Sequence, residues 1–238
     1  LFFLIQHFYF KLFGASVIVS RLPSAFAALG TAIAIFFIGK RLGGLRAGLI
    51  SLGALALNSY FIWMGRIGLL ESVFTFFLCL GLYYFIKALE DNPKYFRQTG
   101  LFWGLAIVTK YTFLFFVPGI VVYILWRERQ VLKNRKFWSG VIVFLAVCLP
   151  ILIYNFGMLQ ARGHFDVQFS DLFKQVHSDW PKLAQRVSFS HVNPGGVLAT
   201  LIEGFSWAYF AVFAVSFFGA LFIFRKSSKM LAIFMVAS

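Results

Sequence analysis

Three ionisable side chains interrupt otherwise apolar stretches of this sequence. Arg66 and Glu71 belong to the segment GRIGLLESVFTFF, and Lys110 lies near the middle of an apolar run from Leu101 to Trp126. A charged group inside a membrane is costly, about 3 kcal/mol for a lysine at the centre of a spanning helix, and is usually kept because it faces a polar cavity, another charge or a substrate. A carboxylate beside two cations could bind a phosphate group and orient a polar reactant.

Plainer interpretations of the same residues stay open. Arg66 and Glu71 could lie at a wet helix end in the headgroup region, or could only neutralise each other. Arg21, near the start of an apolar run, could be an arginine that reaches from a helix end to the interface. Tyr111 and Asn155 could hydrogen-bond a sugar, but a tyrosine at the interface is an ordinary anchor and Asn155 is better interpreted as a helix C-cap.

The composition indicates an integral membrane protein. Hydrophobic residues make up 61% of the 238 residues, 33 of them are Phe, and only 13% are charged, which a soluble domain of this size could not hide in its core. The net charge of +14 does not indicate a nucleic-acid partner, because the basic residues form short clusters between apolar runs and not a stripe with interleaved aromatic residues. Cys79 and Cys148 lie inside apolar runs and predict no disulfide or metal framework.

The apolar runs predict an all-α fold, a polytopic transmembrane helical bundle that forms one domain over residues 1–238. Leu1–Phe13 is too short to span a membrane and predicts an interfacial helix. Residues 157–200, the one long polar segment, predict an extracytoplasmic loop. The expected spans are 17–38, 47–64, 69–86, two short helices that meet at Lys110 within 101–126, then 137–156, which Pro150 interrupts, 201–224, and the start of another from Leu231.

The distribution of basic residues favours the break at Lys110. With the break, the loops at one face carry fourteen Lys/Arg against three Asp/Glu, and the other face carries eight against five. Because cytoplasmic loops are enriched in Lys and Arg, the first face is predicted to be cytoplasmic, and Glu71, Arg66 and Lys110 are predicted to lie outside. The chain starts with Leu, shows no signal peptide and ends inside an apolar run, so we expect it to be part of a longer protein.

Several segments form a recognisable set. In chain order they are LFFLIQHFYFKLFG (1–14), RLPSA (21–25), IGKRLGGLRAGL (38–49), GRIGLLESVFTFF (65–77), GLAIVTKYT (104–112) and LPILIYN (149–155). As a set they resemble the polyprenyl-phosphate-sugar-dependent glycosyltransferases of the GT-C superfamily, in particular the protein O-mannosyltransferase-like and aminoarabinose-transferase-like bacterial group.

The resemblance implies a polyprenyl-phosphate sugar donor and a lipid, glycan or protein acceptor, at the extracytoplasmic face of a bacterial or archaeal plasma membrane. Glu71 would occupy the family's second acidic position, where it could orient the acceptor or bind a divalent metal. Arg66, Lys110 and Arg21 would meet the donor phosphate. The family's main catalytic aspartate would lie upstream of Leu1, so the chain alone is expected to be inactive. No nucleotide cofactor is expected, because neither G-x-x-x-x-G-K-[ST] nor G-x-G-x-x-G occurs.

Two other classes of function remain as alternatives. A multi-pass transporter or flippase of lipid-linked sugars would place charges along its pathway, but it predicts inverted repeats that the sequence does not show. A non-catalytic scaffold would leave Glu71, Arg66 and Lys110 unexplained. The polar residues of the expected loop match no metal-ligand spacing and predict a hydrated acceptor-binding loop; they are His164, Asp166, Asp171, His177, Asp179 and His191.

Overall fold

The computed structural model describes residues 1–166, 169–170 and 173, and within that part every regular element is helical. The all-α fold is therefore confirmed. The expected span 201–224, the segment from Leu231 and the loop residues Asp171, His177, Asp179 and His191 lie outside the described residues. The elements are α1 (Phe2–Phe13), α2 (Val17–Ala56), α3 (Ser59–Arg66), α4 (Leu70–Glu90), η1 (Pro93–Tyr95), α5 (Phe96–Thr109), η2 (Tyr111–Phe115), α6 (Val117–Arg127), η3 (Arg129–Lys133) and α7 (Arg135–Arg162).

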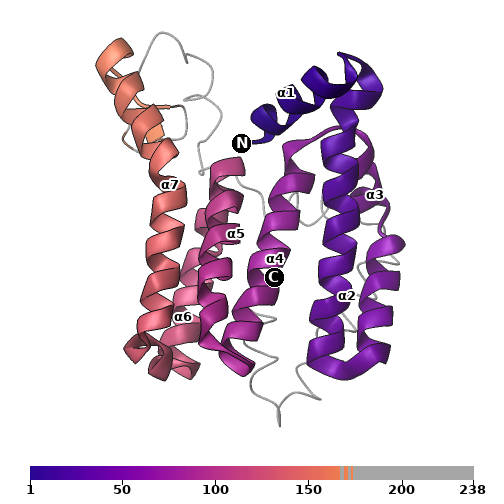
Figure 1. Ribbon diagram of the computed structural model, residues 1–238, viewed down its shortest axis with the longest axis vertical. Helices are drawn as coiled ribbons and strands as arrows, with labels where there is room; N and C mark the ends of the chain where they lie inside the picture. The colour runs from indigo at the N-terminus through magenta and orange to yellow at the C-terminus, as the bar shows by residue number, and fades with distance from the viewer. Residues whose placement is uncertain (167–168, 171–172, 174–238) are drawn as a thin grey trace, which may run out of the picture.

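Helix α2 is a helical hairpin with two legs that lie side by side (Figure 1). The chain reverses at Gly43 and Gly44, and Gly44 has a φ of 79°, a left-handed conformation that favours glycine. The legs approach closely because Gly39 and Gly48 face each other: a Cβ added at Gly39 would lie 3.1 Å from the Cα of Gly48. Small residues permit such close contact between apolar helices.

The expected single span 47–64 is wrong, because the return leg ends at Ala56 and α3 is a separate helix. Asn58 begins α3, and its Oδ1 accepts a hydrogen bond from the Phe61 amide at 3.0 Å. An asparagine side chain that binds a backbone amide in this way competes with helix continuation and favours an N-cap.

The expected break at Lys110 is confirmed. Helix α5 ends at Thr109, Lys110 has extended backbone angles (φ −153°, ψ 127°), and η2 and α6 follow. Helix α5 starts at Phe96, five residues before the expected Leu101. With 14 residues it is about 21 Å long, which is shorter than the hydrocarbon core.

Helix α7 continues to Arg162, so the expected boundary between a span ending at Phe156 and a loop beginning at Gly157 is wrong. Pro150 lies inside the helix without ending it. The residues after Gly157 are good helix formers, and the helix ends only at Gly163, whose φ of 75° suits the left-handed C-terminal position. Asn155 therefore lies inside α7 and is not a C-cap.

The helices form one bundle in which α4 packs between α2 and α5, and α5 packs against α7 (Figure 1). The α5–α7 crossing is tight because Gly100 and Gly140 bring two backbones into contact. Aromatic side chains dominate the core between these helices, among them Phe85, Trp103 and Phe113. Helix α1 lies across one end of the bundle, at an angle to the long helices, in the position expected for an interfacial helix.

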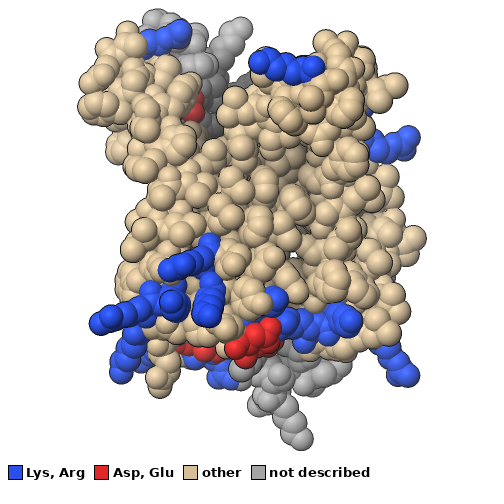
Figure 2. Space-filling view, viewed as in Figure 1, with Lys and Arg blue, Asp and Glu red and all other residues tan. Residues whose placement is uncertain are grey.

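Three described helices, α2, α4 and α7, are long and apolar enough to cross a membrane. Figure 2 shows that Lys, Arg, Asp and Glu gather mainly at the end of the molecule opposite α1, with a largely uncharged band between the two ends. The uncharged band and the two polar ends are the pattern of a membrane protein.

Candidate functional site

Glu71 and Lys110 form an ion pair at the end of the bundle near α1. Glu71 lies in the first turn of α4, and Lys110 lies in the extended link between α5 and η2. The Lys110 Nζ lies 2.8 Å from the Glu71 Oε1, and the two side chains are 37% and 30% exposed. The break in α5 and α6 thus brings Lys110 to a carboxylate 39 residues away in the sequence.

Buried contacts fix the position of Glu71. The Ser24 hydroxyl, which is fully buried, donates a hydrogen bond to the Leu69 carbonyl at 2.8 Å. Gly68 turns the chain just before this point with a φ of 68°, and the Thr75 hydroxyl donates to the Glu71 carbonyl at 2.8 Å. The first turn of α4 is therefore tied to α2 through Ser24, a residue of the RLPSA segment.

The Glu71–Lys110 pair leaves hydrogen-bonding capacity unused. The second carboxylate oxygen of Glu71, Oε2, is buried and accepts no hydrogen bond from any described residue. A carboxylate can accept several hydrogen bonds and an ammonium group can donate three. Within the described part, Lys110 donates one side-chain hydrogen bond, to Oε1 of Glu71. The 37% exposed Lys110 side chain therefore has donors left for a further polar group, whereas Oε2 of Glu71 is closed to solvent.

A second carboxylate, that of Asp166, lies next to Tyr111, the residue that follows Lys110. The Tyr111 hydroxyl lies 3.5 Å from Oδ2 of Asp166, a long hydrogen bond. Asn155, which is buried in α7, accepts a hydrogen bond from the Asp166 amide at 3.1 Å and donates to the Ile151 carbonyl at 3.0 Å. Asn155 thus positions Asp166 from within a helix, and residues 110 and 111 together reach two carboxylates.

The structure does not bring Arg66 or Arg21 into this pair. Arg66 ends α3 with an exposed side chain, and Glu71 pairs with Lys110 in the described part of the chain, so the alternative of a mutual Arg66–Glu71 bridge is wrong. Arg21 is also exposed. Its Cα would lie 3.6 Å from a Cβ added at Gly68, which places Arg21 beside the turn that leads to Glu71.

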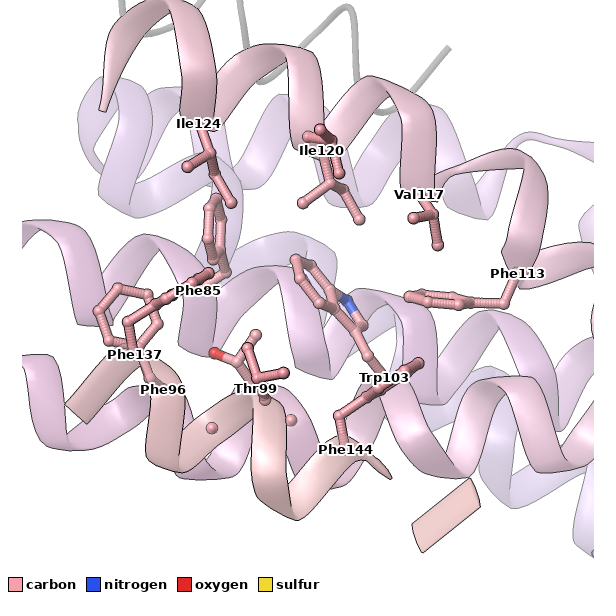
Figure 3. A pocket seen from close by; sticks show the side chains of 14 residues that line it. Phe85, Phe96, Thr99, Trp103, Phe113, Val117, Ile120, Ile124, Phe137 and Phe144 are labelled. Atoms are coloured by element: carbon pink, nitrogen blue, oxygen red, sulfur yellow. The ribbon is translucent and has the colours of Figure 1, made fainter. Parts of the chain in front are cut away.

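An apolar cavity of about 280 Å³ lies between α4, α5, α6 and α7 (Figure 3). Phe113 lines one part of it, and the Phe113 amide donates a hydrogen bond to the Lys110 carbonyl at 3.3 Å. Trp103 lies along the cavity, and Phe96 and Phe137 line another part. The cavity therefore lies in the apolar interior of the bundle, and Phe113, three residues after Lys110, is one of its lining residues.

The described residues do not by themselves make a metal site at Glu71. No three His, Cys, Asp or Glu side chains cluster anywhere in the described part. The Lys110 ammonium lies 2.8 Å from the Glu71 carboxylate, and its charge repels a cation. A divalent metal at Glu71 would need ligands from outside residues 1–166, and it stays a prediction.

The sequence alone did not identify Ser24 as a site residue, and it gave Asp166 no role beyond that of a loop residue. Ser24 had a signal, since it belongs to the RLPSA segment, but its partner Leu69 lies 45 residues away and only the packing of α2 on α4 identifies it. Asp166 had no signal of its own in the sequence. Its link to Asn155 spans the end of α7, which the sequence placed six residues too early.

Comparison with known proteins identifies relatives of the chain. The model of the family described as "Dolichyl-phosphate-mannose-protein mannosyltransferase" matches residues 1–154. A protein of Aquifex aeolicus (strain VF5), named "Uncharacterized protein", is 30% identical over 178 residues, which are 71% of this chain and 34% of that protein. The chain thus spans about a third of the length of the curated relative it matches. No solved structure matches the chain.

Proposed function

This chain belongs to the dolichyl-phosphate-mannose-protein mannosyltransferase family, and on that premise we propose that it forms part of a membrane glycosyltransferase. In this proposal the donor is a sugar carried on a polyprenyl phosphate, and the acceptor is a lipid, a glycan or a protein. The reaction takes place at the bundle end that carries Glu71 and Lys110.

The observation that carries the proposal is the polar pair together with an apolar cavity whose lining includes Phe113, three residues after Lys110. A lipid-phosphate sugar has a charged head and a hydrocarbon chain, so its site needs a cation next to an apolar surface. Lys110 supplies the cation, and the cavity that begins at Phe113 supplies the apolar surface. The cavity, at about 280 Å³, accommodates a segment of such a chain, while the remainder stays in the bilayer.

In the reaction, Lys110 would bind the phosphate and stabilise the negative charge that develops on it as the sugar leaves. Pre-positioned cations contribute most where charge forms in the transition state and water is excluded. Glu71 would hold the lysine in place through Oε1. Its Oε2 is closed to solvent, so orienting a hydroxyl group of the acceptor would require the first turn of α4 to open toward the acceptor.

The other predicted residues have supporting parts in this proposal. Tyr111 and Asn155 would border the sugar through Asp166, whose carboxylate and amide they contact. Arg21, beside the turn before Glu71, and Arg66, at the end of α3, would attract the anionic donor without being in the ion pair.

The proposal places the Glu71–Lys110 end outside the cytoplasm, in a multi-pass protein of the plasma membrane. Support comes from the gathering of basic residues at the opposite end (Figure 2), which is the side that favours the cytoplasm. Sugar transfer at the outer surface also suits a lipid-linked donor, which needs no nucleotide at the site.

The test is donor specificity in the full-length protein reconstituted in liposomes. We expect a radiolabelled sugar to move to an acceptor from the polyprenyl phosphate but not from a nucleotide carrying the same sugar. Transfer from the nucleotide sugar would contradict the proposal. Movement of the intact lipid-linked sugar between leaflets without transfer would contradict it as well, and would favour a flippase.

A further inference from the structure

A second pocket lies at the opposite end of α4, away from the Glu71–Lys110 pair. Its volume is about 300 Å³, and its walls are Phe37, Lys40, Arg41 and Tyr83. We propose that this pocket binds the phosphate headgroup of an anionic phospholipid of the surrounding bilayer. The proposal concerns a structural lipid and is independent of sugar transfer.

The cationic wall of the pocket is held in place by packing. A Cβ added at Gly48 would lie 3.1 Å from the backbone nitrogen of Lys40, so the close crossing of the two α2 legs fixes the Lys40 backbone. Arg41 is held by two hydrogen bonds to Asp91, at 2.8 and 2.7 Å, and by a third contact of 3.4 Å to Glu90. The Lys40 backbone and the Arg41 side chain are therefore held by contacts within the protein and need no ligand to position them.

The aromatic wall is equally well defined. The rings of Phe37 and Tyr83 lie 6.1 Å apart, centre to centre. The Arg41 guanidinium lies 5.9 Å and the Lys87 ammonium 5.6 Å from the centre of the Tyr83 ring, at distances typical of cation–π contacts. An aromatic ring at the membrane interface, with a polar hydroxyl and an apolar body, suits the boundary between a lipid headgroup and its chains.

The charges around the pocket leave a positive balance. Three cations, Lys40, Arg41 and Lys87, face two carboxylates, Glu90 and Asp91. Both carboxylates are bound to Arg41, whereas the exposed Lys40 forms no ion pair with another described residue. Lys40 is therefore the cation on which binding of an anion mainly depends.

The position of the pocket favours a lipid over a soluble anion. Lys40 and Arg41 lie in the last turn of the first α2 leg, just before the kink at Gly43 and Gly44. The turn of α2 lies at the end opposite α1 (Figure 1), and basic residues gather at that end (Figure 2). Phe37 lies one turn deeper and is 43% exposed, so a headgroup at Lys40 would place its acyl chains against Phe37. Basic pockets between spanning helices are known binding sites for anionic lipid headgroups.

The experiment is native mass spectrometry of the purified protein titrated with phosphatidylglycerol or with phosphatidylcholine. We expect phosphatidylglycerol to bind more tightly, and Lys40→Gln to weaken its binding about fivefold, since a basic residue near an anionic headgroup contributes on the order of 1 kcal/mol. Lys40→Arg should retain binding. Arg46→Gln is the matched control, because Arg46 is exposed at the same end but does not line the pocket.

Three results would overturn the proposal. Unchanged binding in Lys40→Gln would remove the site, and an equal loss in Arg46→Gln would show that only diffuse surface charge attracts the lipid. Competition by glycerol phosphate at the concentration at which the lipid binds would assign the pocket to a soluble anion. The unfolding temperature of each variant, measured in parallel, shows whether a loss of binding comes from a loss of fold.

Discussion

Helix α4 carries an ion pair at each end, and the two pairs differ in how completely their partners are used. At its start, Glu71 meets Lys110 through one contact of 2.8 Å. At its end, Asp91 meets Arg41 through two hydrogen bonds that engage both carboxylate oxygens. Exposure does not separate the pairs, since the side chains of Glu71 and Lys110 are 30% and 37% exposed and those of Arg41 and Asp91 23% and 43%.

The difference comes from the chemistry of the cation. An arginine fork matches a carboxylate with two parallel hydrogen bonds that engage both of its oxygens, which suits a structural contact between helices. A lysine is a compact charge with three donors, and at Glu71 one donor is used while Oε2 remains unpaired within the described residues. In the proposed function, the pair that engages both carboxylate oxygens holds the fold, and the pair with unused lysine donors binds the donor phosphate.

The largest expected effect separates the two pairs by activity. Lys110→Gln should lower sugar transfer by the full-length protein about 100-fold, the order of magnitude seen when one preorganised donor to a developing charge is removed. Asp91→Asn breaks the other pair and should leave transfer within about twofold of wild type, because Asp91 lies at the far end of α4. Steady-state rates for both variants check this. Equal losses would show that the pairs do not differ in function.

A second prediction converts one kind of pair into the other. Lys110→Arg keeps the charge but offers a fork that can bind both carboxylate oxygens of Glu71, so we expect stability to rise by about 0.5 kcal/mol and transfer to fall about tenfold. Thermal unfolding and transfer rates are measured on the same preparations. A variant with wild-type activity would show that charge alone matters and that unused hydrogen-bonding capacity does not.

A third prediction concerns the contact that positions Glu71. Ser24→Ala removes the hydrogen bond to Leu69 and should lower the free energy of unfolding by about 1 kcal/mol, with a several-fold loss of transfer. Ser20→Ala is the control, because the Ser20 hydroxyl is exposed and bonds only to the Val17 carbonyl of its own helix turn. If both variants behave alike, the Ser24 contact does not position the site.

The smallest effect is a pH dependence at the Arg41–Asp91 pair. The hydrogen bonds from Arg41 hold the pKa of the Asp91 carboxyl below its ordinary value. The stability that the pair adds is therefore present above the unfolded-state pKa, about 3.9, and is lost as the pH falls through the lower folded-state value. We expect the unfolding temperature to fall in acid by a small amount that Asp91→Asn removes. An identical acid profile in that variant would contradict this.

The sequence was informative where a single residue carried a large cost. A lysine in the middle of an apolar run predicted the break between α5 and α6, because leaving it in hydrocarbon is expensive. The interruption at Asn58 and the continuation of α7 past Gly157 were not predicted. An asparagine N-cap and a glycine within a helix each change the free energy of the helix by only about 1 kcal/mol, so packing decides where the helix ends.

The same limit applies to the site. Glu71 and Lys110 could be identified as candidate site residues because they are charged residues in apolar stretches. Their pairing depends on the positions of α4 and α5, and by sequence spacing alone Arg66 was an equally plausible partner for Glu71. Ser24 reaches the site through a hydrogen bond to Leu69, 45 residues away in the sequence. Asp166 is positioned by a hydrogen bond to Asn155, inside α7. Contacts of this kind follow from the tertiary fold and leave little trace in local sequence patterns.

The central claim is that Lys110 has capacity left for a donor phosphate. Its most direct test is the equilibrium affinity of the detergent-solubilised protein for a polyprenyl phosphate without a sugar, compared among wild type, Lys110→Gln and Lys11→Gln. Lys11 is exposed in α1 at the same end of the bundle and serves as the matched change of charge. We predict that Lys110→Gln binds at least about tenfold more weakly, since a hydrogen bond to a charged group contributes about 1.5–3 kcal/mol, and that Lys11→Gln binds as wild type does. Equal affinities for wild type and Lys110→Gln would contradict the account.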